Sequence, residues 1–162
     1  MLKSWWDKQK ALSYYLNGYN FEFSVDLGSG PGIYGHILKA HTKHLVGVDY
    51  VSQSMLLQND YDEFIQAQIQ DYVLPAQCDS VFMLDSIEHM LEEEGQTTLE
   101  KIGLHRFILV TTPSKYRPSN PIYNPHISVW TQEKLEKLGF QVHKYVVYIF
   151  DRDLIALRKP KT

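Results

Sequence analysis

A glycine-dense turn preceded by an aspartate is the part of this sequence best suited to holding a small ligand. The segment 25–35 reads V-D-L-G-S-G-P-G-I-Y-G, with Gly28, Gly30 and Gly32 in alternate positions. Because glycine has no Cβ, the backbone can turn sharply there and approach a ligand closely, as glycine-rich turns do in nucleotide-binding α/β folds. The carboxylate of Asp26 would repel a pyrophosphate but would hold an ammonium group. The turn therefore favours S-adenosylmethionine over a dinucleotide.

An acidic residue further along the chain has the spacing that a ribose contact needs. Asp49 ends a strand-like run and lies twenty-one residues after Gly28. A carboxylate at this place can accept hydrogen bonds from both ribose hydroxyls. The alternative is a structural role at the start of a short helix that Ser52 would cap.

Polar residues also follow the next strand-like run, where an adenine would be expected. Gln68 could hydrogen-bond the adenine amino group while the backbone of Ile69 faces the ring. Gln70 and Asp71 are close competitors for this contact, and a solvated polar cluster at the strand end is an equally good interpretation.

A dinucleotide site is the competing interpretation of the same turn. The segment 30–35 satisfies G-x-G-x-x-G, and Asp49 stands downstream as that pattern requires. An NAD-dependent oxidoreductase would follow from it. Asp26 and the pair Glu88–His89 fit that interpretation poorly, so we keep it as a minor alternative.

Strand-like and helix-like runs alternate along the chain, which predicts βαβ units around a mostly parallel sheet. The expected strands are 21–26, 44–49, 64–69, 80–84 and 106–112, followed by an antiparallel hairpin of 140–150 and 154–158 that turns at D-R-D. The expected helices are 5–16, 32–40, a short one after Ser52, 91–102 and 131–138. The proline-rich loop 113–127 is the longest connection and is expected near the active site.

Length and composition limit the kind of protein. The 162 residues predict one domain, 1–162, with a leader helix in 1–20. The net charge of −3 comes without a basic stripe, so a phosphate backbone is not an expected partner. Cys78 is the single cysteine and can build neither an internal disulfide nor a cysteine-rich zinc site. With no signal peptide and no membrane-length apolar run, we expect a cytoplasmic protein, and the sequence predicts no metal site.

Four pieces of the sequence, taken in order, resemble the class I S-adenosylmethionine-dependent methyltransferases. They are V-D-L-G-S-G-P-G, V-G-V-D-Y, C-D-S-V-F-M-L-D-S-I-E-H-M and H-I-S-V-W-T-Q-E-K-L-E-K-L-G-F-Q-V. The resemblance extends from about residue 21 to the C-terminus. It implies an α/β fold of the Rossmann-like type, with a seven-stranded, mostly parallel sheet, a C-terminal antiparallel hairpin and helices on both faces.

The resemblance also implies which residues hold the cofactor. Asp26 and the glycine turn would bind the amino-acid end, Asp49 the ribose, Gln68 with Ile69 the adenine, while Leu84 and Asp85 would lie beside the sulfonium. The full set of expected cofactor-binding residues is Asp26, Gly28, Ser29, Gly30, Gly32, Asp49, Tyr50, Gln68, Ile69, Leu84 and Asp85. For Asp85, steering a cationic acceptor or capping the following helix are the alternatives.

Two departures from the family pattern concern the adenine contact and the substrate cover. The third-strand element is usually an acid followed by a small residue, whereas this chain has A-Q-I. Little sequence precedes the first strand and no segment is inserted near the fifth, the places where the family usually builds its cover. The site is therefore expected to be open, to be completed by a homodimer or partner subunit, or to be covered by the loop 113–127.

Methyl transfer needs a base only when the acceptor is protonated at neutral pH, and histidine is then the usual choice. His89 follows the strand 80–84 and His126 ends the proline-rich loop, so these two are the candidate catalytic residues. For His89 the alternative is orienting the cofactor pocket, and for His126 it is capping the loop. We expect a methyltransferase for a small-molecule acceptor with an oxygen or nitrogen nucleophile. A non-catalytic or partner-dependent cofactor-binding module is the alternative, with protein or RNA methylation less favoured.

Overall fold

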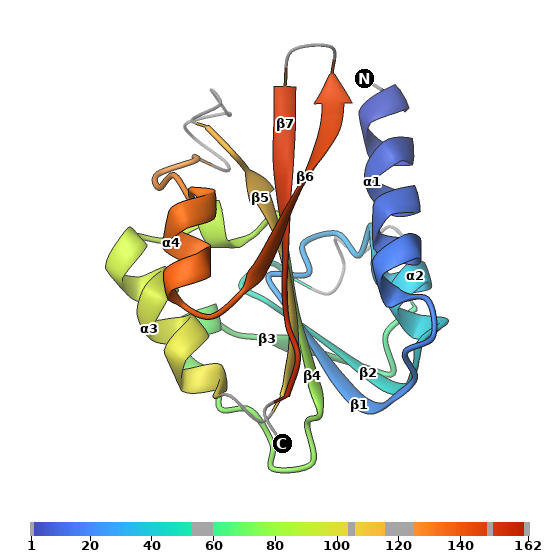
Figure 1. Ribbon diagram of the computed structural model, residues 1–162. Coiled ribbons are helices and arrows are strands. Elements are labelled where there is room, and N and C mark those ends of the chain that lie inside the picture. The colour runs from blue at the N-terminus through green and yellow to red at the C-terminus, as the bar shows by residue number, and fades with distance from the viewer. Residues whose placement is uncertain (1, 53–59, 104–105, 116–124, 149–150, 161–162) are drawn as a thin grey trace.

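The computed structural model describes residues 2–52, 60–103, 106–115, 125–148 and 151–160, and its centre is a seven-stranded sheet of order β3-β2-β1-β4-β5-β7-β6. The strands are β1 (Phe21–Leu27), β2 (Thr42–Asp49), β3 (Glu63–Gln66), β4 (Ser80–Leu84), β5 (Phe107–Pro113), β6 (Gln141–Tyr148) and β7 (Asp151–Arg158). The α-helices are α1 (Leu2–Leu16), α2 (Gly35–Lys39), α3 (Glu92–Ile102) and α4 (Gln132–Lys137). Figure 1 shows α1 and α2 on one face of the sheet and α3 and α4 on the other. The predicted fold class is confirmed.

The order of the parallel strands reverses between β1 and β4. β1 pairs in parallel with both β2 and β4, after which β3 extends one side of the sheet and β5 the other. Ligands of open α/β sheets bind beyond the carboxyl ends of the strands at such a switch point. The glycine turn follows β1 directly, so the chain connectivity alone places it there.

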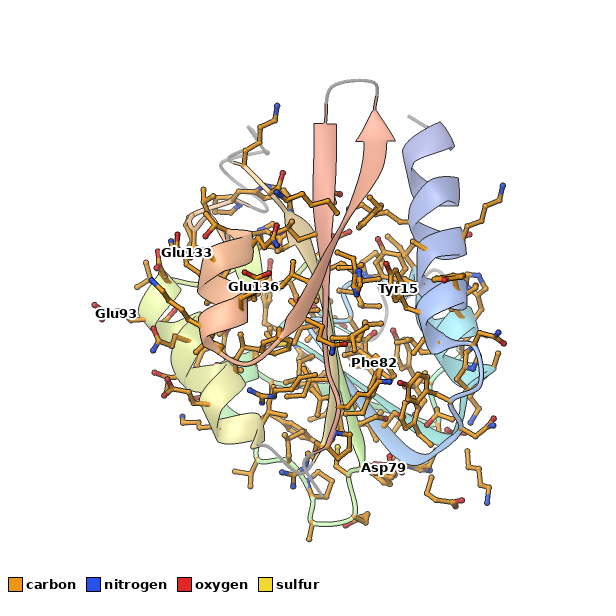
Figure 2. The ribbon with its side chains drawn as sticks, viewed as in Figure 1. Tyr15, Asp79, Phe82, Glu93, Glu133 and Glu136 are labelled. Atoms are coloured by element: carbon orange, nitrogen blue, oxygen red, sulfur yellow. The ribbon has the colours of Figure 1, made fainter. Side chains whose placement is uncertain are left out.

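Two apolar layers, one on each face, hold the sheet between the helices. Along β1, Val25 and Leu27 pack toward α3 and α4, whereas Phe21 packs with α1 and α2. Figure 2 shows Phe82 of β4 in the layer on the α1 side, while Glu93, Glu133 and Glu136 project from α3 and α4 toward solvent. Each face is thus sealed by helices, and the strand ends are the part of the sheet left for ligands.

The C-terminal hairpin forms as predicted, but its turn was placed wrongly. Asp151 begins β7, so the D-R-D segment lies inside the strand, and β6 and β7 pair from Tyr148↔Asp151 onward. Asp153 was expected at an exposed turn, yet its side chain is fully buried against Lys8 of α1. The D-R-D segment can lie within β7 because the ammonium group of Lys8 compensates the buried carboxylate of Asp153.

Several other expected elements differ in extent. The helix predicted over 32–40 is only the five residues of α2, because residues before Gly35 continue the glycine turn. The third strand ends at Gln66 rather than Ile69, and a 3-10 turn, η2 (Ile69–Asp71), follows it. The short helix predicted after Ser52 and residues 116–124 of the proline-rich loop lie outside the described residues. In the described part of the chain no helix has the length and apolar character to cross a membrane.

Gly95 in α3 allows Trp130 to be buried against the helix. A Cβ at Gly95 would lie 2.5 Å from Cζ2 of Trp130 and 3.1 Å from Cγ1 of Ile87. We expect Gly95→Ala to lower the free energy of unfolding by about 1–2 kcal/mol, because overpacking a rigid buried ring exceeds the gain of ~1 kcal/mol in helix propensity. Urea unfolding measures this difference. Thr97→Ala, at an exposed position of the same helix, is the control and should change stability little; equal stability of both variants would contradict the packing argument.

Candidate functional site

The glycine turn after β1 adopts left-handed backbone conformations that glycine tolerates best. The φ angles of Gly28, Gly30 and Gly32 are 78°, 52° and 81°. A Cβ at Gly28 would lie 2.4 Å from Cβ of Ser86, so this glycine is required for packing. At Gly30 a Cβ would meet no atom of the described residues within 4 Å, which makes this the open side of the turn. A ligand can therefore approach the backbone at Gly30.

Asp49 lies at the end of β2, close to the same turn. Its Oδ2 accepts a hydrogen bond from the Gly30 amide at 2.7 Å, and its Oδ1 accepts one from the Val51 amide at 3.0 Å. A carboxylate has about four acceptor positions, so each oxygen keeps a lone pair for a further donor. The contacts to the backbone fix the orientation of the side chain.

Asp26 is buried within β1 rather than displayed beside the turn. Its side chain is about 1% exposed; Oδ2 accepts a hydrogen bond from the Tyr61 hydroxyl at 2.7 Å, and Oδ1 has no partner among the described residues. Burial, and to a smaller extent the nearby Asp49 carboxylate, raise the pKa of Asp26 to about 7 despite the Tyr61 hydrogen bond, which lowers it. The orphan oxygen gives this carboxylate a capacity for a cationic or hydrogen-bonding ligand.

The residues proposed for the adenine lie beyond the end of β3, whereas the sequence predicted them within the last positions of that strand. Gln68 is exposed, and Ile69 begins η2 with its Cδ1 only 3.1 Å from the position of a Cβ on Gly28. Tyr50 is 56% exposed, and its carbonyl accepts a hydrogen bond from Nε2 of Gln66. Ile69 thus connects the end of β3 with the glycine turn.

Asp85 follows β4 in a strained conformation, with a φ of 52° that is unusual for a residue other than glycine. Its Oδ2 accepts hydrogen bonds from Nζ of Lys8 and from the Tyr34 hydroxyl, both at 2.7 Å, and its Oδ1 accepts one from Thr111. Burial raises the pKa of Asp85, but the Lys8 ammonium and these hydrogen bonds hold it below its usual value. The carboxylate is therefore fixed in its ionised form.

Three of these contacts were missed by sequence reasoning. Lys8, Tyr34 and Tyr61 come from α1, from the turn before α2 and from the start of the segment leading to β3. Each is an ordinary residue of its element, and no local pattern in the sequence indicates that it contacts an aspartate far along the chain.

The two candidate catalytic histidines lie side by side. The ring centroids of His89 and His126 are 4.7 Å apart, and both rings approach the buried Glu88. Burial, and then the Asp85 carboxylate, raise the pKa of Glu88 to about 8. The sequence placed both histidines near the strand ends but gave Glu88 no role, because His126 lies 37 positions after His89 and nothing local shows that the two meet.

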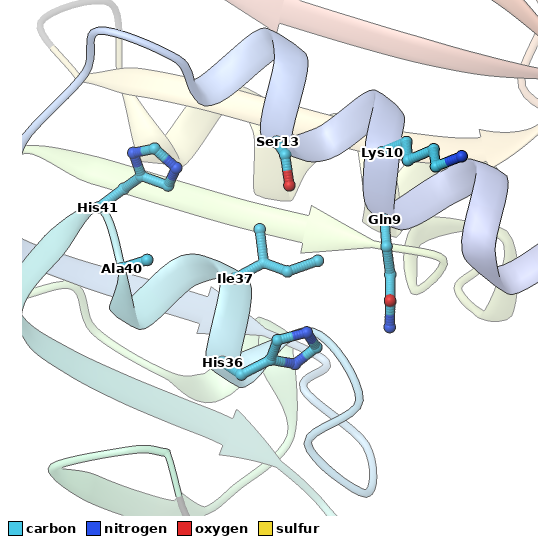
Figure 3. Close-up of a pocket in the computed structure, with 7 residues that line it drawn as sticks. All are labelled: Gln9, Lys10, Ser13, His36, Ile37, Ala40 and His41. Atoms are coloured by element: carbon cyan, nitrogen blue, oxygen red, sulfur yellow. The ribbon is translucent and has the colours of Figure 1, made fainter.

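A groove of about 440 Å³ lies elsewhere, between α1 and α2. Figure 3 shows Gln9 and Ser13 of α1 facing His36 and Ile37 of α2 across it. None of the predicted cofactor-binding residues lines this groove. This groove is therefore separate from the predicted cofactor site.

Comparison with known proteins shows the kind of domain and the fold. Residues 25–103 match the profile of a family described as a methyltransferase domain. No sequence among the curated proteins matches the chain. The fold is similar to a DhpI–SAH complex (TM-score 0.69, 14% identity, 96% of this chain and 87% of that chain). It is also similar to the 1,6-didemethyltoxoflavin-N1-methyltransferase of Burkholderia thailandensis (0.68, 16%, 94% and 78%).

A third similar structure is an S-adenosylmethionine-dependent methyltransferase from Clostridium acetobutylicum (TM-score 0.67, 12% identity, 99% of this chain and 92% of that chain). At these identities the similarities establish the fold. A sheet of this strand order with a glycine turn at its switch point defines a Rossmann-like cofactor-binding domain. Together with the methyltransferase-domain match over residues 25–103, this fold is similar to that of the class I S-adenosylmethionine-dependent methyltransferases.

Proposed function

We propose that this protein transfers a methyl group from S-adenosylmethionine to a small-molecule acceptor through an oxygen or nitrogen nucleophile. The observation that supports this most directly is the meeting of the Gly30 turn with Asp26 and Asp49 at the reversal of strand order. When bound, S-adenosylmethionine supplies an electrophilic methyl group on a sulfonium.

The residues present fit this cofactor. Gly30 leaves open space where its backbone can meet a ligand, and the buried Oδ1 of Asp26 has no partner among the described residues. Asp49 keeps acceptor capacity for ribose hydroxyls while its backbone contacts hold it in place. In this proposal Asp26 and the turn residues Gly28, Ser29 and Gly32 hold the amino-acid end.

The remaining residues of the proposed site follow the ends of the next strands. Tyr50 and Gln68 with Ile69 border the nucleoside, and Leu84 with Asp85 borders the sulfonium. Asp85 can act there as a fixed negative charge, since Lys8 and Tyr34 hold it ionised and oriented. The chain's contribution to the reaction is then mainly positioning, which alone can supply much of a rate enhancement.

The proposed class of acceptor is based on the net charge of the chain and on what a similar protein binds. The net charge of −3 without a basic stripe does not favour a nucleic acid. The similar Burkholderia thailandensis enzyme is described with 1,6-didemethyltoxoflavin bound, which is a small nitrogen acceptor by its name.

Calorimetric titration with S-adenosylmethionine, S-adenosylhomocysteine and NAD tests the cofactor, and an acceptor screen for methyl transfer tests the reaction. Binding without any transfer would favour the partner-dependent module, and binding of NAD alone would overturn the proposal.

Replacing Asp49 tests the ribose contact. We expect Asp49→Ala to weaken the binding of S-adenosylmethionine by about 1–3 kcal/mol, because hydrogen bonds to a charged acceptor are lost. Asp49→Asn keeps an oxygen for the Gly30 amide and separates the loss of ribose contacts from collapse of the turn. Glu63→Ala, on the adjacent strand with a side chain 59% exposed, is the control. An unchanged dissociation constant in both Asp49 variants would refute the assignment.

A further inference from the structure

Glu88, His89 and His126 bring three metal-binding side chains together beyond the end of β4. One ligand atom from each residue can be chosen so that all lie within 4.8 Å of one another. Glu88 and His89 belong to the 3-10 turn η3 (Ile87–His89), whereas His126 comes from the end of the proline-rich loop. Two imidazoles and one carboxylate are the donor set of many catalytic zinc sites and of non-haem iron sites.

We propose that Glu88, His89 and His126 bind a divalent first-row transition-metal ion through one carboxylate oxygen and two ring nitrogens. A metal with bonds of about 2.1 Å keeps its ligand atoms within ~4.2 Å of one another, so small side-chain rotations close the site. Three protein ligands leave at least one coordination position open. This inference does not depend on the proposed cofactor or acceptor.

Glu88 has the burial and the missing contact expected of a metal ligand. The residue is 2% exposed, and its Oε2 has no hydrogen-bond partner among the residues that the structure describes. An unpartnered polar atom in the interior is costly unless an ion or another group compensates it. No lysine or arginine is paired with Glu88 in the described ion pairs, and two imidazoles are its neighbours instead.

His89 is oriented as a metal-binding histidine usually is. Its Nδ1 lies 2.9 Å from the carbonyl oxygen of Pro125. Because a carbonyl only accepts, Nδ1 carries the proton and Nε2 keeps its lone pair. A backbone carbonyl that fixes the tautomer in this way is the usual outer partner of a ligating histidine.

The segment that carries His126 is fixed to η3 by its backbone and side chains. The amides of Ile127 and Ser128 donate to the carbonyl of Glu88 at 2.9 and 3.2 Å. Nε1 of the buried Trp130 donates to the carbonyl of Ile87 at 3.3 Å. The two parts of the proposed site are therefore held together by contacts independent of any ligand, which lowers the entropic cost of binding an ion.

Asp85 is excluded from the ligand set, although it is the nearest further carboxylate along the chain. Its oxygens already accept hydrogen bonds from Lys8, Tyr34 and Thr111. Among the residues that the structure describes, the site therefore has three protein ligands rather than four. Such a site suits Zn²⁺, Co²⁺, Mn²⁺ or Fe²⁺ better than Mg²⁺ or Ca²⁺, which prefer oxygen ligands.

The test uses the untagged 162-residue chain, treated with a chelator and titrated with Co²⁺ or Zn²⁺. We expect about one ion per chain, with a visible absorption spectrum for Co²⁺. Glu88→Gln and His126→Ala should each weaken binding about tenfold or more, since each removes one of the three ligands. His44→Ala is the matched control, because His44 pairs with Glu63 on the surface without a second histidine.

Several results would overturn the inference. They are no binding of Co²⁺ or Zn²⁺ at micromolar concentration, equal binding by wild type and both ligand variants, or preferential binding of Mg²⁺. Circular dichroism establishes that each variant folds, and His89→Ala replaces any variant that does not. Titration of the same samples with S-adenosylmethionine reports separately on the proposed function, so a failed metal site and a failed cofactor site are distinguishable.

Discussion

Replacing Lys8 with methionine is expected to lower the free energy of unfolding by about 3–5 kcal/mol. Nζ of Lys8 lies 2.7 Å from Oδ2 of Asp85 and 2.9 Å from Oδ2 of Asp153, and the exposed fractions of the three side chains are 13%, 25% and 0%. Removing the shared cation leaves two carboxylates, one of them fully buried, without their main charge partner. Breaking a buried ion pair from one side typically costs this much. Denaturant unfolding of both proteins measures it.

Two further variants separate the charge argument from simple loss of packing. Lys8→Met combined with Asp153→Asn should recover much of the loss, because the buried charge disappears with its partner. Lys134→Met removes the exposed pair of Lys134 and Glu92, with side chains 38% and 50% exposed, and should cost less than about 1 kcal/mol. Equal losses for Lys8→Met and Lys134→Met would show that the buried triad contributes no special stability.

Replacing Asp26 with asparagine is expected to stabilise the protein at alkaline pH and to weaken cofactor binding. The pKa of Asp26 is raised from 3.8 to about 7, mainly by burial. A raised pKa means that the folded state binds the proton more tightly. Its contribution to stability is therefore present below pH 4 and is lost as the pH rises through about 7. At about 1.4 kcal/mol per pH unit, the loss approaches ~4 kcal/mol above pH 7.

The pH dependence is what identifies this effect. The advantage of Asp26→Asn over wild type should grow by about 2–3 kcal/mol between pH 5 and pH 8, whatever fixed cost its amide group brings. Urea unfolding at both pH values measures the change. Asp71→Asn, at an exposed position, is the control. A constant difference between Asp26→Asn and wild type would show that Asp26 is ionised throughout.

A functional consequence accompanies this stability gain. In the proposed site the Asp26 carboxylate holds the ammonium end of S-adenosylmethionine, and asparagine lacks the charge. More stable protein with weaker cofactor binding would be the usual trade between stability and activity at a binding site. Stabilisation with unchanged binding would mean that Asp26 is a structural residue only.

Most of the fold could be predicted from the sequence alone, whereas the place of the cofactor site stays a prediction. Alternating strand and helix patterns predicted the parallel sheet and the final hairpin, because periodicity reports which face of an element is buried. The glycine turn could also be predicted from local sequence, because Gly28 and Gly30 adopt positive φ angles that other residues avoid. Asp49 could be proposed as a ribose ligand because strand connectivity brings the end of β2 beside the end of β1, and this contact stays a prediction.

The partners of the charged groups became visible only in the folded structure. The sequence does not show that Lys8 bridges Asp85 and Asp153, so the D-R-D segment was predicted as a turn and not as the start of a strand. It also does not show that Tyr61 covers Asp26, or that His126 returns to Glu88 and His89. Such contacts join residues from 35 to 145 positions apart (Asp26–Tyr61 and Lys8–Asp153). Local patterns carry the signal for elements, whereas desolvation and charge pairing depend on which elements meet in space.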